Sequence, residues 1–162
     1  MNPSIEQTLV EQTSVQLFFM SCMKAHEKII QINVKGNSME PAFNDGDILC
    51  VEFVHASRFG TGDIIVFQQH GQLIAHRLLK TRLNCNNKTR QYFQKGDNRP
   101  GGAWVTEDRM VGRVTRVLPK SGLPIVLTSR IARRINRWRA FLGRVTILCQ
   151  TWRNRIKKSI HG

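Results

Sequence analysis

Acidic residues are scarce in this sequence, and the last 38 residues contain none. Twenty-five Lys and Arg residues face 11 Asp and Glu residues, so the net charge is +14 at pH 7. Ten of the cations lie in segment 125–162, which leaves residues 1–124 with a net charge of only +4. The basic character therefore belongs to the C-terminal tail, and an anionic partner is expected there.

Long hydrophobic runs are also missing. The most apolar N-terminal stretch, Val15–Met23, is about half as long as a membrane span and has polar neighbours on both sides. It lacks the basic start and the small-residue cleavage site of a secretory signal. We therefore expect a protein of the cytoplasm or of the cytoplasmic membrane face.

Cysteines are few and far apart, at positions 22, 50, 85 and 149. No pair has the two-residue gap of a zinc knuckle or a redox motif, so no metal and no cofactor are expected. Four reduced thiols fit a reducing cytoplasm.

Short β-strands are predicted over residues 29–118. Apolar and polar residues alternate from Ile30 to Lys35, which is the period of a half-buried strand. Further apolar runs follow, separated by turns such as Asn44–Gly46 and His70–Gly71. This pattern is typical of an all-β sandwich or a partly closed barrel. The further apolar runs lie at 47–54, 63–67, 73–79, 92–93 and 110–118.

Helices are predicted on both sides of the β region. Residues 3–26 begin with the residue pattern of a capping box. Residues 125–160 carry apolar side chains at three- and four-residue steps, among them Trp138, Phe141 and Trp152. The expected fold class is therefore mainly β with a helix at each end. The expected segments are a helical segment 1–28, a β domain 29–124 and a basic amphipathic tail 125–162.

The basic tail has three interpretations. Cations around an apolar stripe are typical of a helix that lies on an acidic membrane surface, here over residues 130–158. The apolar side could instead pack on the domain or on a partner helix. Nucleic acid is the least favoured partner. A membrane span is not expected, because Arg137, Arg139 and Arg144 would lie inside it.

A serine with a glycine two residues before it follows the first predicted strand. Ser38 stands in the segment Val34–Pro41, where the turn would expose its hydroxyl and its backbone amide. A hydroxyl is a poor nucleophile at neutral pH and needs a base beside it, together with donors for the oxyanion that forms. The Ser38 amide is one candidate donor. Taken alone, the segment fits a plain strand-to-turn connector equally well.

A histidine and an acid follow further along the chain. His76 interrupts the apolar run Leu73–Leu79, and a histidine in such a strand must use both ring nitrogens. Taken alone, it fits a hydrogen-bonded core or edge histidine better than a catalytic one. Asp97 stands in the tight turn Gly96–Asn98.

Five sequence blocks occur together and in order. They are GNSMEP at 36–41, GDIIVF at 62–67, IAHRLL at 74–79, KGDN at 95–98 and VGRV at 111–114. Over this stretch the chain resembles the signal peptidase and LexA-type serine peptidase superfamily, and most closely its short, anchorless bacterial signal-peptidase-like members. The resemblance implies a mostly β catalytic domain and hydrolysis of a peptide bond.

The resemblance also implies residue roles. Ser38 takes the place of the nucleophile, and His76 stands where bacterial signal peptidases and LexA-type proteins have a general-base lysine. The histidine form is similar to the endoplasmic-reticulum and archaeal enzymes. Asp97 matches the acid of the KGDN turn and would orient the imidazole. Asn37 and Met39, on either side of the serine, are expected at the oxyanion site and the substrate groove.

Three features depart from the family pattern. The endoplasmic-reticulum enzymes carry another acid after the KGDN turn, whereas Arg99–Ala103 has none. Asp97 or the later Asp108 must then serve, or a Ser-His dyad acts alone. Gly36 stands where signal peptidases often have a serine, as in LexA-type proteins. The N-terminal residues read as neither a membrane anchor nor a DNA-binding module.

The sequence thus predicts a serine endopeptidase that acts on an exposed, extended segment of a peptide or protein. The alternative is a catalytically silent regulator or binding module of the same fold, whose basic tail binds membrane or nucleic acid.

Overall fold

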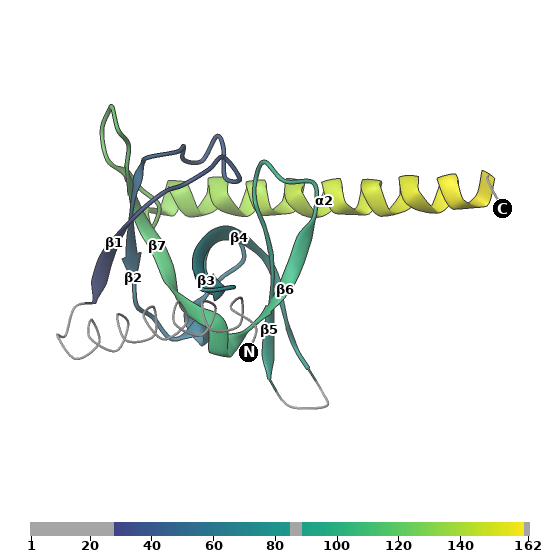
Figure 1. Ribbon diagram of the computed structural model, residues 1–162, viewed down its shortest axis with the longest axis horizontal. Helices are drawn as coiled ribbons and strands as arrows, with labels where there is room; N and C mark the ends of the chain where they lie inside the picture. The colour runs from purple at the N-terminus through teal and green to yellow at the C-terminus, as the bar shows by residue number, and fades with distance from the viewer. Residues whose placement is uncertain (1–27, 85–88, 161–162) are drawn as a thin grey trace, which may run out of the picture.

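Eight antiparallel strands in one strongly curled sheet and one long C-terminal helix form the computed structural model, which describes residues 28–84 and 89–160 (Figure 1). The mainly β fold class is confirmed, and the helix predicted over residues 3–26 lies outside the described residues. The elements are β1 (Ile29–Asn33), β2 (Ile48–Glu52), η1 (Ala56–Arg58), β3 (Ile64–Gln69), β4 (Gln72–Leu83), β5 (Arg90–Lys95), β6 (Gly102–Thr106), η2 (Glu107–Arg109), β7 (Met110–Leu118), β8 (Ile125–Val126) and α2 (Arg130–Ile160).

The strand order is β1-β2-β7-β3-β4-β5-β6, and β8 pairs with β7. Strand β7 therefore lies between β2 and β3 and joins the first half of the sheet to the second. The predicted turn His70–Gly71 closes the hairpin of β3 and β4, with Gln69 opposite Gln72. Both turn residues have positive φ, 49° and 73°, as a two-residue turn between twisted strands requires.

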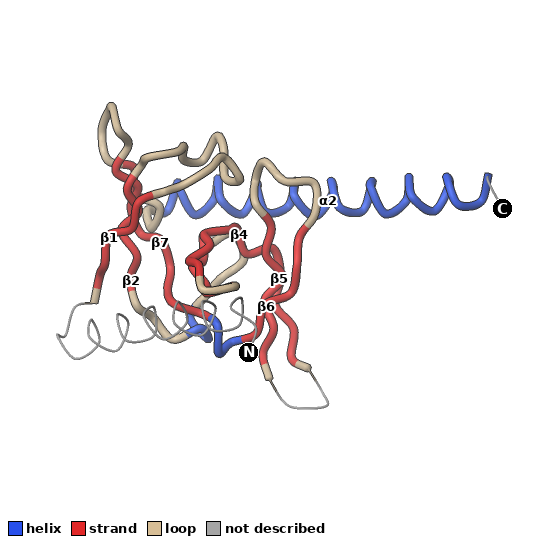
Figure 2. Tube along the Cα trace, in the orientation of Figure 1, coloured by secondary structure: helices blue, strands red, loops and turns tan. Residues whose placement is uncertain are grey.

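Strand β3 is buried on both faces, and its side chains alternate between two cores. Ile64 and Val66 pack with residues of β1, β2 and β7, whereas Ile65 and Phe67 pack with Tyr92 and its neighbours in the second half of the sheet. Strand β3 thus lies between the two halves of the sheet, whose strong curl is visible in Figure 2. The first core is Ile30, Met39, Phe43, Leu49, Val51, Ile64, Val66, Val114 and Val117, and the second is Ala56, Phe59, Ile65, Phe67, Leu78, Tyr92 and Val105.

Two strands were not predicted from the sequence. Strand β6 begins at Gly102, and its Trp104 packs edge-on against Phe93 of β5 at 5.1 Å between ring centroids. Strand β8 lies at residues 125–126, which the sequence pattern assigned to the C-terminal helix. That helix begins only at Arg130, because the Ser129 hydroxyl accepts the Ala132 N–H and caps it. The division of the chain at residues 28/29 and 124/125 stays a prediction.

Helix α2 runs along the sheet, and its C-terminal part extends past it (Figure 1). It contacts β4 through a polar and small-residue face. Asn136 and Ala140 on this face are buried, and Gly143 lies close to the Leu79 side chain. The Arg144 Nε donates to the Leu79 carbonyl at 2.7 Å. The Nη2 of the same guanidinium donates to this carbonyl as well. Gly143 lies within the continuous helix.

Candidate active site

The turn that carries Ser38 follows β1. Gly36 has a φ of +87°, which favours glycine, and its N–H donates to the Asp45 carboxylate at 2.7 Å. On the other side of Ser38, the Met39 side chain is only 1% exposed and packs in the first core. The chain is therefore anchored before and after Ser38, while the Ser38 side chain remains partly exposed.

The turn between β5 and β6 holds the Ser38 segment from the opposite side. The Asn98 N–H donates to the Ser38 carbonyl at 2.9 Å, and its Nδ2 donates to the Asn37 carbonyl at 3.2 Å. The Asp97 N–H donates to the Met39 Sδ at 3.4 Å. Gly96 permits this approach, because a Cβ there would lie 2.6 Å from the Ser38 carbonyl oxygen. Two chain segments far apart in sequence thus fix the Ser38 backbone.

His76 reaches Ser38 from β4. Its Nε2 lies 3.2 Å from the Ser38 Oγ, within the range expected of a nucleophile and its base. Its Nδ1 lies 2.5 Å from the Oε1 of Gln94, on the neighbouring strand β5. Because Oε1 can only accept, Nδ1 carries the proton and Nε2 presents its lone pair to the Ser38 hydroxyl. The hydrogen bond to Gln94 therefore selects the tautomer that a general base needs.

Burial lowers the pKa of His76 below its usual value of 6.5. The hydrogen bond to Gln94 acts in the opposite direction and raises this pKa. The positive charges of Arg99 and Lys95 lower it further, whereas the negative charge of Asp97 raises it. The net effect keeps the imidazole neutral at pH 7, which is the form that accepts a proton.

Asp97 does not contact the imidazole in this structure. Its two carboxylate oxygens accept from Arg77, with Nε to Oδ1 at 2.8 Å and Nη2 to Oδ2 at 2.6 Å. The Arg77 side chain is fully buried, and its Nη1 also donates to the Gly62 carbonyl and to the Asn136 Oδ1, each at 3.0 Å. Asp97 therefore fixes the turn that holds Ser38 and links it, through Arg77, to α2.

Lys95 lies one residue before Gly96 and is also buried. Burial lowers the pKa of its amine, and the charge of Asp97 acts in the opposite direction. The Lys95 Nζ donates to the Gly96 carbonyl at 3.1 Å. The side chain at hydrogen-bond distance from Ser38 is thus an imidazole, and this lysine amine is bound to the backbone of the turn.

A cleft of about 670 Å³ opens beside Ser38 and His76. One wall follows β1 and the segment after it, and the other follows the first half of β4. Arg99 and apolar side chains such as Phe43 and Leu73 are also among the residues that line the cleft. The cleft is therefore large enough for several side chains of a bound ligand, and its lining is part apolar and part polar.

The other predicted residues lie around this site in different ways. Asn37 is exposed, and its carbonyl accepts from Asn98. Met39 is a core residue that supports the turn and does not line the cleft. Asp108 is exposed in η2, and the contacts of His76 go to Ser38 and Gln94. Among the described residues, none accepts a hydrogen bond from the Ser38 N–H, so this amide is available to an oxyanion.

Sequence reasoning missed Gln94 and Arg77. Gln94 is 5% exposed in β5, where a buried amide must find partners and therefore signals a hydrogen-bond network. Arg77 follows His76 directly, so the alternation of strand β4 places it on the opposite face. A fully buried arginine requires an anionic partner, and Asp97 is the acid that supplies it.

A second serine and histidine pair lies on the surface. The His55 Nδ1 is 2.8 Å from the Ser57 Oγ, and its Nε2 is 3.7 Å from a Glu107 carboxylate oxygen. This pair caps η1, because the His55 side chain also accepts the Ser57 N–H. Its imidazole is 74% exposed, and the cleft beside Ser38 does not include it. The pair is a local cap and serves below as a control for Ser38.

A mainly β domain that holds a serine and a histidine together in a cleft has the arrangement of a serine peptidase. The model of the family described as Peptidase S24-like matches residues 3–91, more than half of the chain. The chain belongs to this family, and the predicted resemblance to the signal peptidase and LexA-type superfamily is confirmed.

The curated relatives carry signal peptidase names. The chain is similar to the signal peptidase complex catalytic subunit SEC11C of Homo sapiens, with 30% identity over 105 residues, which are 58% of this chain and 54% of that protein. It is 34% identical over 114 residues to the corresponding SEC11 of Schizophyllum commune, covering 55% of this chain and 59% of that protein. The chain thus spans little more than half the length of these relatives.

Proposed function

We propose that this protein is a serine endopeptidase that cleaves an extended segment of a peptide or protein, with Ser38 as the nucleophile and His76 as the general base. The observation that carries the proposal is the 3.2 Å approach of the Ser38 Oγ to the His76 Nε2 inside the cleft. The tautomer selected by Gln94 and the lowered pKa of His76 both support a base role at neutral pH. Membership of a peptidase family adds independent support.

The reaction proceeds by acyl transfer. The His76 Nε2 takes the Ser38 hydroxyl proton while the Oγ attacks the scissile carbonyl carbon. The oxyanion that forms is stabilised by the Ser38 N–H. Collapse of the tetrahedral intermediate breaks the C–N bond, and the imidazolium returns its proton to the leaving amine. Water then attacks the ester with the same base, which releases the carboxylic acid and restores Ser38.

Free strand edges on both sides of the cleft favour an extended substrate. Among the described residues, β1 pairs only with β2, and β4 pairs with β5 only from Arg77 onward. Residues 72–76 of β4 therefore present an unpaired edge beside His76. A peptide in the cleft can form backbone hydrogen bonds with either edge, as in β-strand addition. This mode positions a peptide bond at Ser38 with little dependence on side chains.

The alternative of a silent binding module is less well supported by this geometry. A module that only binds peptides has no need of a partly buried imidazole whose second nitrogen is held by Gln94 at 2.5 Å. It also has no need of a glycine at position 96, which brings the turn within contact of both Ser38 and His76.

A peptide library derived from a whole proteome tests the proposal without knowledge of the natural substrate. The full chain is incubated with the library, and new peptide termini are identified by mass spectrometry. We expect specific termini with the unmodified chain and none with Ser38→Ala, a substitution that removes one hydroxyl from a turn. Ser57→Ala, which removes the hydroxyl of the surface pair, should cleave as the unmodified chain does. Equal cleavage by Ser38→Ala would refute the proposal.

A further inference from the structure

Helix α2 presents an apolar stripe to solvent. Trp138 and Trp152 are 66% and 67% exposed, and Leu148 is 68% exposed. The Trp138 and Phe141 rings, both at the surface, pack edge to face with 5.8 Å between their centroids. The members of this outer stripe are Ile131, Ile135, Trp138, Phe141, Leu142, Val145, Leu148 and Trp152.

The outer stripe lies opposite the face by which α2 docks on the sheet. Asn136, Ala140 and Gly143 form the docked face, and 3.6 residues per turn place Trp138 and Val145 on the other side of the helix. The docked face is fixed by the bond from Arg77 to Asn136, and Gly62 adds a close approach, since a Cβ there would lie 2.8 Å from the helix backbone. Helix α2 therefore cannot turn its stripe inward without losing these contacts.

Positive charge surrounds the outer stripe. Arg130, Arg134 and Arg137 are exposed in the first turns of α2, and Arg153 is exposed toward its end. The sequence from residue 125 onward contains no acidic residue that could neutralise them. An exposed apolar face bordered by uncompensated arginines is complementary to a lipid surface with anionic headgroups, which offers both an apolar and an acidic layer.

We propose that the outer stripe of α2 binds the surface of an acidic lipid leaflet, with the helix axis parallel to the membrane plane. The described part of the chain contains no helix long and apolar enough to cross a membrane, and this binding mode needs none. Trp138, Phe141 and Trp152 enter the headgroup region, while the arginines contact the phosphates. Nucleic acid would neutralise the arginine charges but would leave the apolar side chains of the stripe exposed to water, so it is the less complementary partner.

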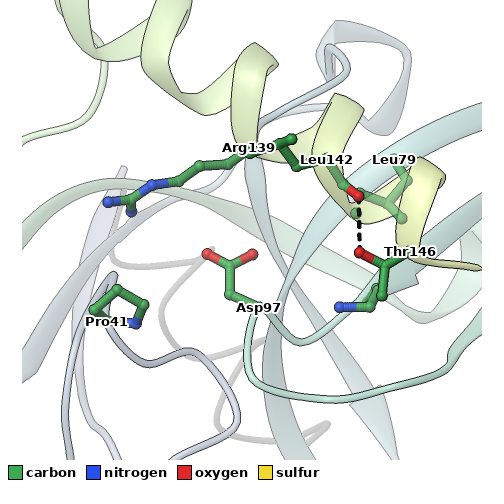
Figure 3. A pocket seen from close by; sticks show the side chains of 8 residues that line it. Pro41, Leu79, Asp97, Arg139, Leu142 and Thr146 are labelled. Carbon is green, nitrogen blue, oxygen red and sulfur yellow. Dashed lines mark hydrogen bonds between the residues drawn. The ribbon is translucent and has the colours of Figure 1, made fainter.

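This mode fixes where the proposed active site stands. Asp97 and Pro41, from the turns around Ser38, line a cavity of about 210 Å³ against Arg139 of α2 (Figure 3). The helix therefore lies between these turns and the leaflet, at a spacing of one helix diameter, roughly 10 Å. The catalytic cleft would be held close to the membrane surface at a set orientation, independently of whether the cleavage reaction is the proposed one.

Vesicle co-sedimentation of the full chain tests this inference. Vesicles of phosphatidylcholine alone are compared with vesicles that also contain phosphatidylglycerol, at low and at physiological salt. We expect binding to the acidic vesicles, weakened by salt. In the variant Arg130→Gln/Arg134→Gln/Arg137→Gln, binding should fall about fivefold per charge removed, or roughly a hundredfold in all. Arg133 is left in place because its Nε donates to the Thr128 carbonyl at the helix start.

A second variant separates the apolar contribution from the charge. Trp138→Gln/Phe141→Gln keeps every cation and should lose at least tenfold in binding to acidic vesicles. Leu83→Gln, at a 60% exposed position on β4, is the control and should bind as the unmodified chain does. The inference is overturned if the full chain fails to pellet with acidic vesicles at low salt, or if Trp138→Gln/Phe141→Gln binds unchanged. It is also overturned if the stripe variant instead abolishes a dimer, or if a single-stranded oligonucleotide binds more tightly than the vesicles.

Discussion

Gln94 Oε1 lies 2.5 Å from His76 Nδ1, at the position where a serine-histidine-aspartate triad has its carboxylate. A neutral amide can select the imidazole tautomer as a carboxylate does. It adds only a dipole when the imidazole becomes charged, and therefore stabilises the imidazolium less. The lowered pKa of His76 is consistent with this arrangement, because burial outweighs both the hydrogen bond to Gln94 and the charge of Asp97, which does not contact the imidazole. Activity should consequently rise on the acidic side of pH 6.5 and reach its plateau by pH 7.

Removing Gln94 should impair the base without unfolding the domain. In Gln94→Ala the imidazole loses the acceptor that keeps the proton on Nδ1, so the fraction in the productive tautomer and orientation falls. We expect cleavage to slow by about two orders of magnitude or more, which is the usual contribution of a positioned base. Circular dichroism checks that the fold is retained. A cleavage rate equal to that of the unmodified chain would show that Gln94 does not position His76.

Replacing Gln94 with an acid should move the pH profile. In Gln94→Glu an anion stands against Nδ1 and raises the pKa of His76, so the acidic limb of the activity profile shifts to higher pH by about one unit or more. The sign follows from the proposed base role, because an imidazole can accept a proton only when it is neutral, and a higher pKa moves its deprotonation to higher pH. An unchanged limb would mean that the titrating group in the profile is not His76.

Replacing Asp97 should lower the stability of the fold, because this carboxylate pairs with Arg77 and does not contact His76. Asp97→Asn leaves Arg77, which is fully buried, without its anionic partner. Breaking a buried ion pair in this way costs about 3–5 kcal/mol in the free energy of unfolding. Glu52→Gln is the control, because its pair with Arg113 is partly exposed and should cost about 1 kcal/mol or less. Urea unfolding measures both, and equal losses would contradict the assigned role of Asp97.

Gly96 should be required because of its position between Ser38 and His76. A Cβ at residue 96 would lie 2.6 Å from the Ser38 carbonyl oxygen and 3.1 Å from the His76 Nε2. Gly96→Ala should therefore displace the Ser38 segment and reduce cleavage about a hundredfold, as a misplacement of about 1 Å does. Gly101→Ala in the same turn region adds a methyl group with no atom within 4 Å and should leave the rate unchanged. Equal rates in both variants would exclude this steric account.

The strands and the serine-histidine pair could be predicted from the sequence, whereas the hydrogen bonds around that pair could not. Alternation and turn residues predict β1 to β5 and β7 because their apolar faces are regular. Strand β6 was missed because its glycine-rich start has low strand propensity, and only Trp104 packing on Phe93 shows why it pairs. The contact of His76 with Gln94 depends on the register between β4 and β5, which contains an irregularity between Leu78 and Lys80. No local sequence pattern encodes that register.

For helix α2, the sequence predicted the apolar stripe but not the face that docks on the sheet. Its apolar period was visible in the sequence, and the usual rule places such a stripe against the core. The structure instead docks α2 through Asn136, Ala140 and Gly143, and the stripe faces solvent. The reason is the buried Arg77, whose last donor requires an acceptor that Asn136 supplies. Hydrophobic periodicity alone could not show this, because the docked face is selected by one hydrogen-bonded network.

The most direct test of the account is to locate the acyl group during turnover. A peptide that the full chain cleaves is mixed with it in excess, the reaction is quenched in acid, and the protein is analysed by intact-mass and peptide mass spectrometry. The account predicts an added mass equal to the N-terminal fragment of the substrate less one water, on the peptide that contains Ser38. His76→Ala should show none of it. An adduct on any other residue, or turnover at the full rate by Ser38→Ala, would contradict the account.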